Sequence, residues 1–585
     1  MKKVFLLVLI AIAFKNNAQE LNVIPKPNLV NFGGEKFYIG NTKFLIQSKD
    51  ISWTTLLPFM PLNLNNSGTT QLPVEIIFDN RSGESYTMCI AKKKIEIKGN
   101  DRGIFYGLQT LAQLTKKSDT LHACTIEDNP AYAYRGMHLD VCRHFFSVEA
   151  IKNYIDVMAS YKLNTFHWHL TDDQGWRIEI KKYPLLTQIG SVRKQTLIGR
   201  QKDEEGTGDY DGQEVKGYYT QEQIKDVIKY AADRKITIIP EIEMPGHSLA
   251  AIASYPFLSC KKEAREVGIR WGGYKDVFCA GNDSTFTFIE DVLTEVMALF
   301  PSDYIHVGGD EVQKNNWKIC EKCKSRMKEN RLKNENELQS YFIKRIDKFL
   351  TAKGKILIGW DEILEGGLAP NATVMSWRGE EGGIAAAKQK HNVVMTPGGY
   401  CYFDHSQNKL QEEPLNIGGN TSYIKVYNYN PTPKILNAEQ QKYILGAQAN
   451  VWTEYIADWG KVWYMTMPRM QALSEVLWTY KGNKNLVNFQ RRMGDECKIL
   501  DQKNYNYRIP EPIGWQDTVD VNKANTITWQ PMNDDDEIYY TWDNNYTLYT
   551  KPIELYKSKG PQILQCYVLN KKTGRKSITY KCVVK

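Results

Sequence analysis

Two adjacent carboxylates, Asp310 and Glu311, are the side chains of this sequence best suited to acid–base chemistry. They follow an apolar segment, 304–307, that predicts a short buried strand, and two glycines separate them from it. Glycine lets another backbone or a ligand approach closely, and barrel enzymes place catalytic carboxylates at the carboxyl ends of their strands. An exposed acidic turn would have the same local sequence, so the interpretation depends on the rest of the chain.

Seven other predicted strands also end in side chains that bind sugars or transfer protons. The strand candidates are 134–141, 165–171, 236–242, 304–309, 355–360, 373–377, 392–396 and 444–452. The polar and aromatic residues at their ends include Arg135, Asp140, Arg143, His144, His167, His169, Asp172, Asp173, Glu243, His247, Trp360, Trp377, Tyr402, Asp404, Trp452 and Glu454. Carboxylates and arginine bond to hydroxyl groups, and tryptophan rings stack on the apolar faces of sugars. This set indicates a pyranose site and glycoside hydrolysis.

The adjacency of Asp310 and Glu311 restricts the mechanism. Ordinary glycosidases hold two carboxyl groups on opposite faces of the sugar, about 5–5.5 Å or about 6.5–9.5 Å apart. Sequence neighbours do not straddle a ring easily, so one carboxylate is expected to be the acid and the other to act from the same side. Neighbours on a regular strand also face opposite ways, so the strand must end at Gly309 for both to reach the site.

The elements that position these side chains alternate between strand and helix. Segment 147–158 begins with a capping serine and is amphipathic, and 462–478 is the most apolar helical segment. Eight β/α units over about 350 residues predict an α/β fold, a (β/α)8 TIM barrel spanning 129–495. The polar insertion 191–218 is expected to be a loop over one rim.

Smaller domains are predicted on both sides of the barrel. Residues 20–128 contain the strand-like runs 43–46, 74–78 and 94–98 and a helical run, 103–114, which indicate an α+β domain that ends at an Asp-Asn-Pro turn. Residues 500–585 contain the strand-like runs 526–529, 537–542 and 565–569, which indicate an all-β, sandwich-like domain.

Composition and the first residues indicate an exported globular protein. The chain has 585 residues, of which 42% are hydrophobic. Its net charge is +8 and its sequence contains no long run of basic residues, which argues against nucleic acid as a partner. Lys2 and Lys3 precede an apolar run, 4–14, typical of a signal peptide over 1–19. We expect a periplasmic or secreted protein, with no later segment that spans a membrane.

The cysteines do not predict a metal site. There are 11, in a compartment that permits disulfides. Cys260 and Cys279 flank a Trp-Gly-Gly-Tyr loop and are candidates for a disulfide. Cys320 and Cys323 form one C-x-x-C pair, and zinc would need two further ligands that no convincing spacing supplies. A disulfide or free thiols are therefore expected, with no metal and no cofactor.

The motifs resemble those of glycoside hydrolase family 20, the β-N-acetylhexosaminidases. The most specific is His-Val-Gly-Gly-Asp-Glu at 306–311. Further similar segments are 134–140, 143–145, 167–177, 240–247 and 446–454, and together the resemblance covers about residues 20–480. One departure is Glu243, where many members carry aspartate.

The resemblance implies a substrate-assisted, retaining mechanism on terminal N-acetylhexosamine. Glu311 would be the general acid and base, and Asp310 would orient the acetamido group and stabilise the charge formed on it. The other implied roles are Tyr402 on the acetamido oxygen, Arg135, Glu454 and Asp404 on the sugar hydroxyls, Trp360, Trp377 and Trp452 as pocket walls, and His247 and Glu243 as supports. Two alternatives remain at this point: a retaining glycosidase with its own nucleophile such as Glu454, and an exported carbohydrate-binding protein.

Overall fold

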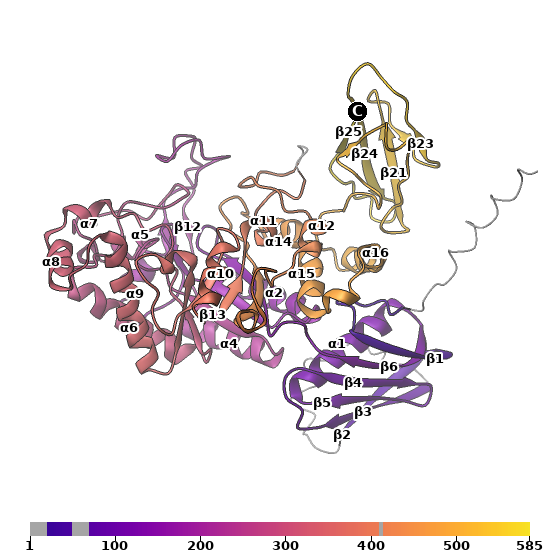
Figure 1. Cartoon of the computed structure of the whole chain (residues 1–585), viewed down its shortest axis with the longest axis horizontal. Helices are drawn as coiled ribbons and strands as arrows, with labels where there is room; N and C mark the ends of the chain where they lie inside the picture. Colours follow the sequence, from indigo (N-terminus) through magenta and orange to yellow (C-terminus); the bar gives the residue numbers. More distant parts are fainter. Residues whose placement is uncertain (1–19, 49–69, 409–412) are drawn as a thin grey trace, which may run out of the picture. The chain divides into compact units, whose positions relative to one another are not determined.

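The computed structural model describes residues 20–48, 70–408 and 413–585 (Figure 1). They fall into two compact units, one ending at Asn129 and one covering Pro130–Lys585. The predicted signal peptide, 1–19, lies outside the described residues. Among the residues that are described, none of the helices combines the length and the apolar character needed to cross a bilayer.

The first unit is a six-stranded sheet with one long helix. The sheet order is β1-β6-β4-β5-β3-β2. The elements are β1 Leu29–Tyr38, β2 Thr42–Ser48, β3 Thr70–Phe78, β4 Tyr86–Ala91, β5 Lys94–Gly99, α1 Asp101–Lys117 and β6 Thr120–Asp128. Asn100 caps α1 by accepting a hydrogen bond from the Gly103 backbone N–H at 2.9 Å. A side chain at Gly107 would lie 2.8 Å from Ile97, so the glycine allows the helix to approach the sheet. The predicted α+β fold is confirmed.

The second unit contains a closed barrel of eight parallel strands in the order β13-β14-β15-β16-β17-β18-β7-β8. The strands are β7 Tyr134–Asp140, β8 Thr165–His169, β13 Thr237–Glu241, β14 Tyr304–His306, β15 Ile356–Trp360, β16 Thr373–Ser376, β17 Val393–Met395 and β18 Ile444–Ala449. Each falls within one predicted segment, and the TIM barrel is confirmed. Because the strands are parallel, their carboxyl ends meet at one rim.

Helices surround these strands in Figure 1 and allow almost continuous apolar strand sequences to be buried. The longer ones are α2 Val148–Ser160, α4 Gln221–Asp233, α6 Asp283–Leu299, α8 Glu321–Glu329, α9 Glu335–Ala352, α10 Glu381–Lys388, α14 Trp459–Thr466, α15 Arg469–Trp478 and α16 Leu486–Gln502. The shorter ones are α3 Leu185–Gln188, α5 Leu249–Ser254, η3 Pro256–Leu258, α7 Asn315–Ile319, η4 Asp361–Leu364, α11 Gly398–Cys401, α12 Tyr423–Asn428, α13 Ala438–Gln441 and η5 Lys481–Asn483.

The structure corrects one predicted helix. The apolar run 462–478 is not continuous, because α14 ends at Thr466 and α15 begins at Arg469. Pro468 lies at the break, where it cannot donate the backbone hydrogen bond that a continuous helix requires.

Short strand pairs lie outside the barrel, and the chain ends in a β domain. The pairs are β9 Thr171–Asp172 with β10 Gly175–Trp176, and β11 Val192–Arg193 with β12 Val215–Lys216 at the two ends of the predicted insertion. The terminal sheet has the order β19-β25-β24-β21-β22, and β20 pairs with β23. Their bounds are β19 Thr518–Val519, β20 Thr526–Ile527, β21 Asp536–Thr541, β22 Thr547–Leu548, β23 Ile553–Glu554, β24 Gln562–Asn570 and β25 Tyr580–Val584.

Candidate active site

The backbone after β14 turns so that two neighbouring carboxylates reach one site. Gly308 and Gly309 have φ values of 65° and 92°, and Glu311 has φ 46°. A β-carbon at Gly308 would lie 1.8 Å from Glu243 Oε2, so this position has no room for a side chain. Glycine adopts such angles freely, whereas a non-glycine residue such as Glu311 adopts them at a cost. The strand β14 therefore ends before Asp310, as expected.

His247 lies between the two carboxylates and a second acidic pair. Its Nε2 is 3.6 Å from Asp310 Oδ2 and 3.6 Å from Glu311 Oε2. Its Nδ1 is 3.2 Å from Asp172 Oδ1 and 3.2 Å from Asp173 Oδ2. Burial alone would lower the pKa of His247, but these acidic groups hold it well above its usual value. We conclude that a charged imidazolium faces both Asp310 and Glu311.

The two carboxylates have different environments. Burial, with a contribution from Glu311, raises the pKa of Asp310 to about 7. The neighbouring His247 lowers the pKa of Glu311, whose side chain is 47% exposed against 13% for Asp310. Asp310 Oδ1 is buried and has no hydrogen-bond partner among the described residues. It is thus available to accept a hydrogen bond from a ligand.

Four aromatic rings lie together near these carboxylates. Trp377 and Tyr402 stack with centroids 6.0 Å apart, and Trp452 lies 6.5 Å from Tyr402 and 5.8 Å from Trp360. Trp360 is 1% exposed, whereas Trp377 and Trp452 are partly exposed. The structure brings these four predicted residues together, with Trp360 in the buried core and Trp377 and Trp452 packed against that core.

A buried carboxylate absent from the predicted site, Glu241, holds Trp360 in place. Glu241 Oε1 accepts hydrogen bonds from Trp360 Nε1 at 2.9 Å and contacts His306 Nδ1 at 2.8 Å. Its Oε2 contacts His167 Nε2 at 3.1 Å and also pairs with His169. Burial alone would raise the pKa of Glu241, but the histidines hold it well below its usual range. The sequence signal for Glu241 was its position two residues before the predicted site residue Glu243, because alternate residues of a strand share a face.

The wall formed by Trp377 is also fixed by a carboxyl group. Trp377 Nε1 donates to Glu362 Oε2 at 2.9 Å, and Glu362 belongs to η4 directly after β15. Burial and the neighbouring Asp310 raise the pKa of Glu362 to about 8. Glu243 is similar: burial and Asp310 raise its pKa well above the usual value. Both carboxyls therefore lie next to Asp310 and favour the neutral form.

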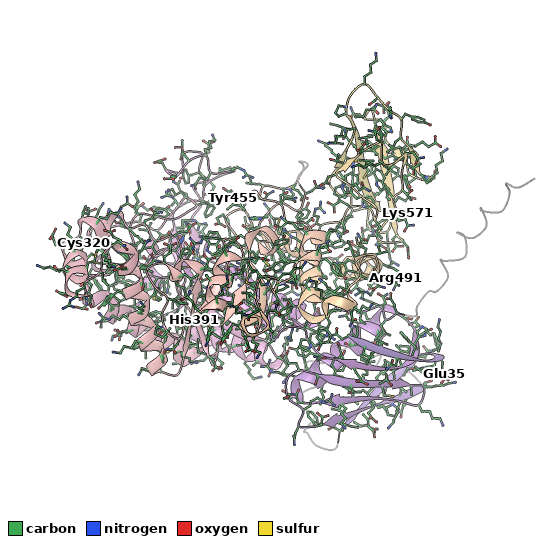
Figure 2. The ribbon with its side chains drawn as sticks, in the orientation of Figure 1. Glu35, Cys320, His391, Tyr455, Arg491 and Lys571 are labelled. Carbon is green, nitrogen blue, oxygen red and sulfur yellow. The ribbon has the colours of Figure 1, made fainter. Side chains whose placement is uncertain are left out.

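The polar edge of the pocket contains Arg143, Glu454 and Asp404. Arg143 Nη1 is 3.8 Å from Glu454 Oε1, and its guanidinium lies 5.2 Å from the centre of the Trp452 ring. Burial and the charge of Glu454 raise the pKa of Asp404 well above its usual range. Asp404 Oδ1 is buried without a hydrogen-bond partner in the described part of the chain. Tyr455, labelled in Figure 2, directly follows Glu454.

The structure does not place Arg135 in this pocket, which corrects one expectation. Arg135 is the second residue of β7, and its Nε donates to Lys162 O at 2.8 Å. Its Nη1 donates to Tyr132 O at 2.9 Å, and its guanidinium lies 5.0 Å from the Trp478 ring. These contacts are at the amino end of the strand, whereas the site is at the carboxyl end, about 16 Å further along a strand of this length. Arg143, three residues after the strand, is the arginine at the carboxyl end, where it pairs with Asp172 at 2.8 Å and with Asp140 at 3.2 Å.

Arg143→Lys and Arg135→Lys are expected to differ in their effect on KM. Lysine cannot reproduce the fork of hydrogen bonds that a guanidinium makes. At Arg143 the change should raise KM for a sugar substrate about tenfold, as expected for losing a charged hydrogen bond. It should also lower the melting temperature, because the buried Arg143 pairs with Asp172 at 2.8 Å and with Asp140 at 3.2 Å. At Arg135 it should lower the melting temperature and leave KM within about twofold. Steady-state kinetics and thermal unfolding of both variants measure this, and an unchanged KM in the Arg143 variant would exclude its role.

Comparison with known proteins places this geometry in context. The family model described as "Glycosyl hydrolase family 20, catalytic domain" matches residues 132–481, and "Glycosyl hydrolase family 20, domain 2" matches residues 20–129. A beta-hexosaminidase of Porphyromonas gingivalis is 49% identical over 494 residues, which cover 80% of this chain and 61% of that protein. A beta-hexosaminidase of Vibrio furnissii is 35% identical, covering 78% of this chain and 76% of its own.

A solved structure agrees with these matches. The GH20 exo beta-N-acetylglucosaminidase of Vibrio harveyi, in complex with N-acetylglucosamine, has a TM-score of 0.72 and 32% identity. The match covers 84% of this chain and 79% of that one.

Proposed function

This chain belongs to glycoside hydrolase family 20, and from that premise we propose that it is a β-N-acetylhexosaminidase. It removes terminal, non-reducing β-linked N-acetylhexosamine from oligosaccharides or glycoconjugates. The observation that carries the proposal is the pair Asp310 and Glu311, which face one imidazolium, His247, beside an aromatic pocket. A protein that only binds sugars has no use for such an acid–base arrangement.

The substrate supplies its own nucleophile. Its 2-acetamido oxygen attacks the anomeric carbon while Glu311 protonates the departing oxygen, which gives an oxazolinium ion. Asp310 accepts a hydrogen bond from the acetamido N–H and stabilises the positive charge. Tyr402 donates a hydrogen bond to the acetamido oxygen. Glu311 then removes a proton from water, which attacks the same carbon, so the β-configuration is retained.

The electrostatics of the free site support these roles once a sugar covers it. Glu311 is half exposed without substrate, and covering it with a sugar removes water from its carboxylate. Loss of water favours the neutral acid, whereas the hydrogen bond from the acetamido group favours the anion at Asp310. Binding therefore moves the shared proton toward the residue that must donate it.

The filled barrel interior supports exo action. Trp360 is 1% exposed and donates a hydrogen bond to Glu241, which is 0% exposed, so the barrel interior is filled at this level. A terminal N-acetylhexosamine fits such a pocket, with its methyl group against the tryptophans and its hydroxyls at Arg143 and Glu454.

Aryl N-acetyl-β-glucosaminide and aryl β-glucoside distinguish this activity from that of an ordinary retaining glycosidase. The first should be hydrolysed at least about 10³-fold faster in kcat/KM, because an intramolecular nucleophile contributes a large effective concentration that the glucoside lacks. Initial rates on matched aryl groups measure the ratio. Equal rates would favour an enzyme nucleophile, and no hydrolysis of either would favour a binding protein.

We also propose that the protein is exported to the periplasm or secreted. Lys2 and Lys3 followed by the apolar run 4–14 support this proposal. The mature chain is expected to lack about the first 18 residues when the full gene product is expressed in a bacterial host. Intact-mass measurement of the exported protein tests this, and a mature chain that still contains residues 1–14 would contradict it.

A further inference from the structure

Four cysteines from three separate segments of the sequence come together outside the candidate active site. Cys260 Sγ is 3.7 Å from Cys323 Sγ, and Cys279 Sγ is 3.7 Å from Cys323 Sγ and 3.8 Å from Cys320 Sγ. All four sulfur atoms lie within 4.8 Å of one another. Figure 2 labels Cys320, which lies between α7 and α8.

These spacings match a tetrahedral metal site. Zinc–sulfur bonds of about 2.3 Å place the sulfurs of a regular tetrahedron about 3.8 Å apart. A disulfide instead needs two sulfurs about 2.05 Å apart. Cys279 approaches two other thiols almost equally, whereas a disulfide would pair it with one.

The backbone around the four thiols is built to hold them together. Ser259 forms a β-bridge with Phe278, and the Cys279 backbone N–H donates to Leu258 O at 2.8 Å, so the first two cysteines sit on paired chains. A β-carbon at Gly281 would lie 2.2 Å from the backbone of Lys322. Only a residue without a side chain lets the Cys279 loop approach the C-x-x-C turn so closely.

The charge and access of the site also suit a metal. Cys320 and Cys323 lie at the amino end of α8, and their C-x-x-C spacing is one that structural zinc sites use. A cavity of about 360 Å³ adjoins them and is lined in part by Lys261, Lys262 and Lys322. Four thiolates around a divalent ion have a net charge of −2, which these lysines offset, and the cavity gives the ion a route of access.

We propose that Cys260, Cys279, Cys320 and Cys323 bind one zinc ion. Four protein ligands fill a tetrahedral shell and leave no open position, so the ion is structural rather than catalytic. The ligand set joins the two ends of the loop 261–278 to the segment that follows the active-site carboxylates.

This zinc site supports the position of Glu311. A β-carbon at Gly273, inside the loop 261–278, would lie 3.7 Å from Glu311 Oε2 and 3.8 Å from His247 Cε1. Segment 312–319 leads directly from Glu311 to Cys320. The ion therefore fixes the base of the loop that borders the acid and the chain that continues from it.

Metal analysis of the intact chain, purified without chelator, tests the proposal. The wild type is expected to contain about one zinc per chain, and Cys260→Ser and Cys323→Ser about tenfold less. Cys582→Ser, at a buried cysteine of β25, is the matched control and should keep its zinc. Cobalt exchanged into the wild type should give thiolate-to-metal charge-transfer absorption.

The wild type alone decides the matter if a variant does not fold. Alkylation should modify the four thiols only after a strong chelator removes the metal, and the chelator should lower the melting temperature. Peptide mapping that finds disulfides among the four cysteines would overturn the proposal. So would stoichiometric iron in place of zinc, or zinc that both ligand variants retain.

Discussion

Replacement of Glu311 by glutamine is expected to lower kcat about 10²- to 10⁴-fold on a substrate with a poor leaving group. The amide keeps the size of the side chain but has no proton to donate. The loss should be much smaller for an aryl group that leaves without protonation. Kinetics on a series of leaving groups of increasing pKa measure this dependence.

Two controls separate this effect from a structural one. Glu365→Gln changes a partly exposed carboxylate that pairs with Arg378 at 3.0 Å, and it should keep kcat within about twofold. The melting temperature of the Glu311 variant should stay close to that of the wild type. A wild-type rate on the poor leaving group would reject Glu311 as the acid.

Asp310→Asn is expected to lower kcat about 10²- to 10³-fold while KM changes by less than about tenfold. The charge that Asp310 stabilises forms only on the way to the oxazolinium ion, so the ground state loses little. A thiazoline that mimics this ion should inhibit the wild type strongly and the variant weakly. A 2-deoxy-2-fluoro glycoside that labels Glu454 or another carboxylate, without thiazoline inhibition, would instead support an enzyme nucleophile.

The pH dependence gives the same variant a second signature. The active free enzyme has one proton on the Asp310–Glu311 pair, since the pKa of Asp310 is about 7 and that of Glu311 is lowered. kcat/KM of the wild type should therefore fall above about pH 7, as the pair loses its last proton. In Asp310→Asn only Glu311 can carry this proton, so the fall in kcat/KM should begin at a lower pH. If kcat/KM of the variant falls at the same pH as that of the wild type, another group titrates there.

The order of the elements could be predicted from the sequence because each strand is a compact apolar run followed by a polar end. Few folds accommodate a regular alternation of such strands with amphipathic helices, and the (β/α)8 barrel is one of them. The break at Pro468 was visible in the sequence, yet the apolar pattern continues through it on both sides. Hydrophobic periodicity alone therefore joined two helices that the backbone separates.

The site residues that were misplaced depend on side-chain direction, which a sequence pattern does not contain. Arg135 and Arg143 belong to the same motif, but they lie at opposite ends of β7, and only the latter meets Glu454. Glu241 was overlooked because its role is a contact with Trp360, 119 residues away. The four cysteines share this property, since Cys260 and Cys323 are separated by 63 residues, and Cys260 lies in a loop whereas Cys323 lies in α8.

The left-handed backbone at Glu311 has a consequence for how the protein evolves. A non-glycine residue at φ 46° costs about 1–2 kcal/mol, which the fold bears so that the acid faces the sugar. Glycine at this position would relieve that cost and abolish the chemistry, an exchange of activity for stability. Selection for catalysis must therefore act continuously against a stabilising change at this codon. In lineages released from that selection, residue 311 is expected to be among the first to drift, which makes its identity a record of whether a homologue still hydrolyses its substrate.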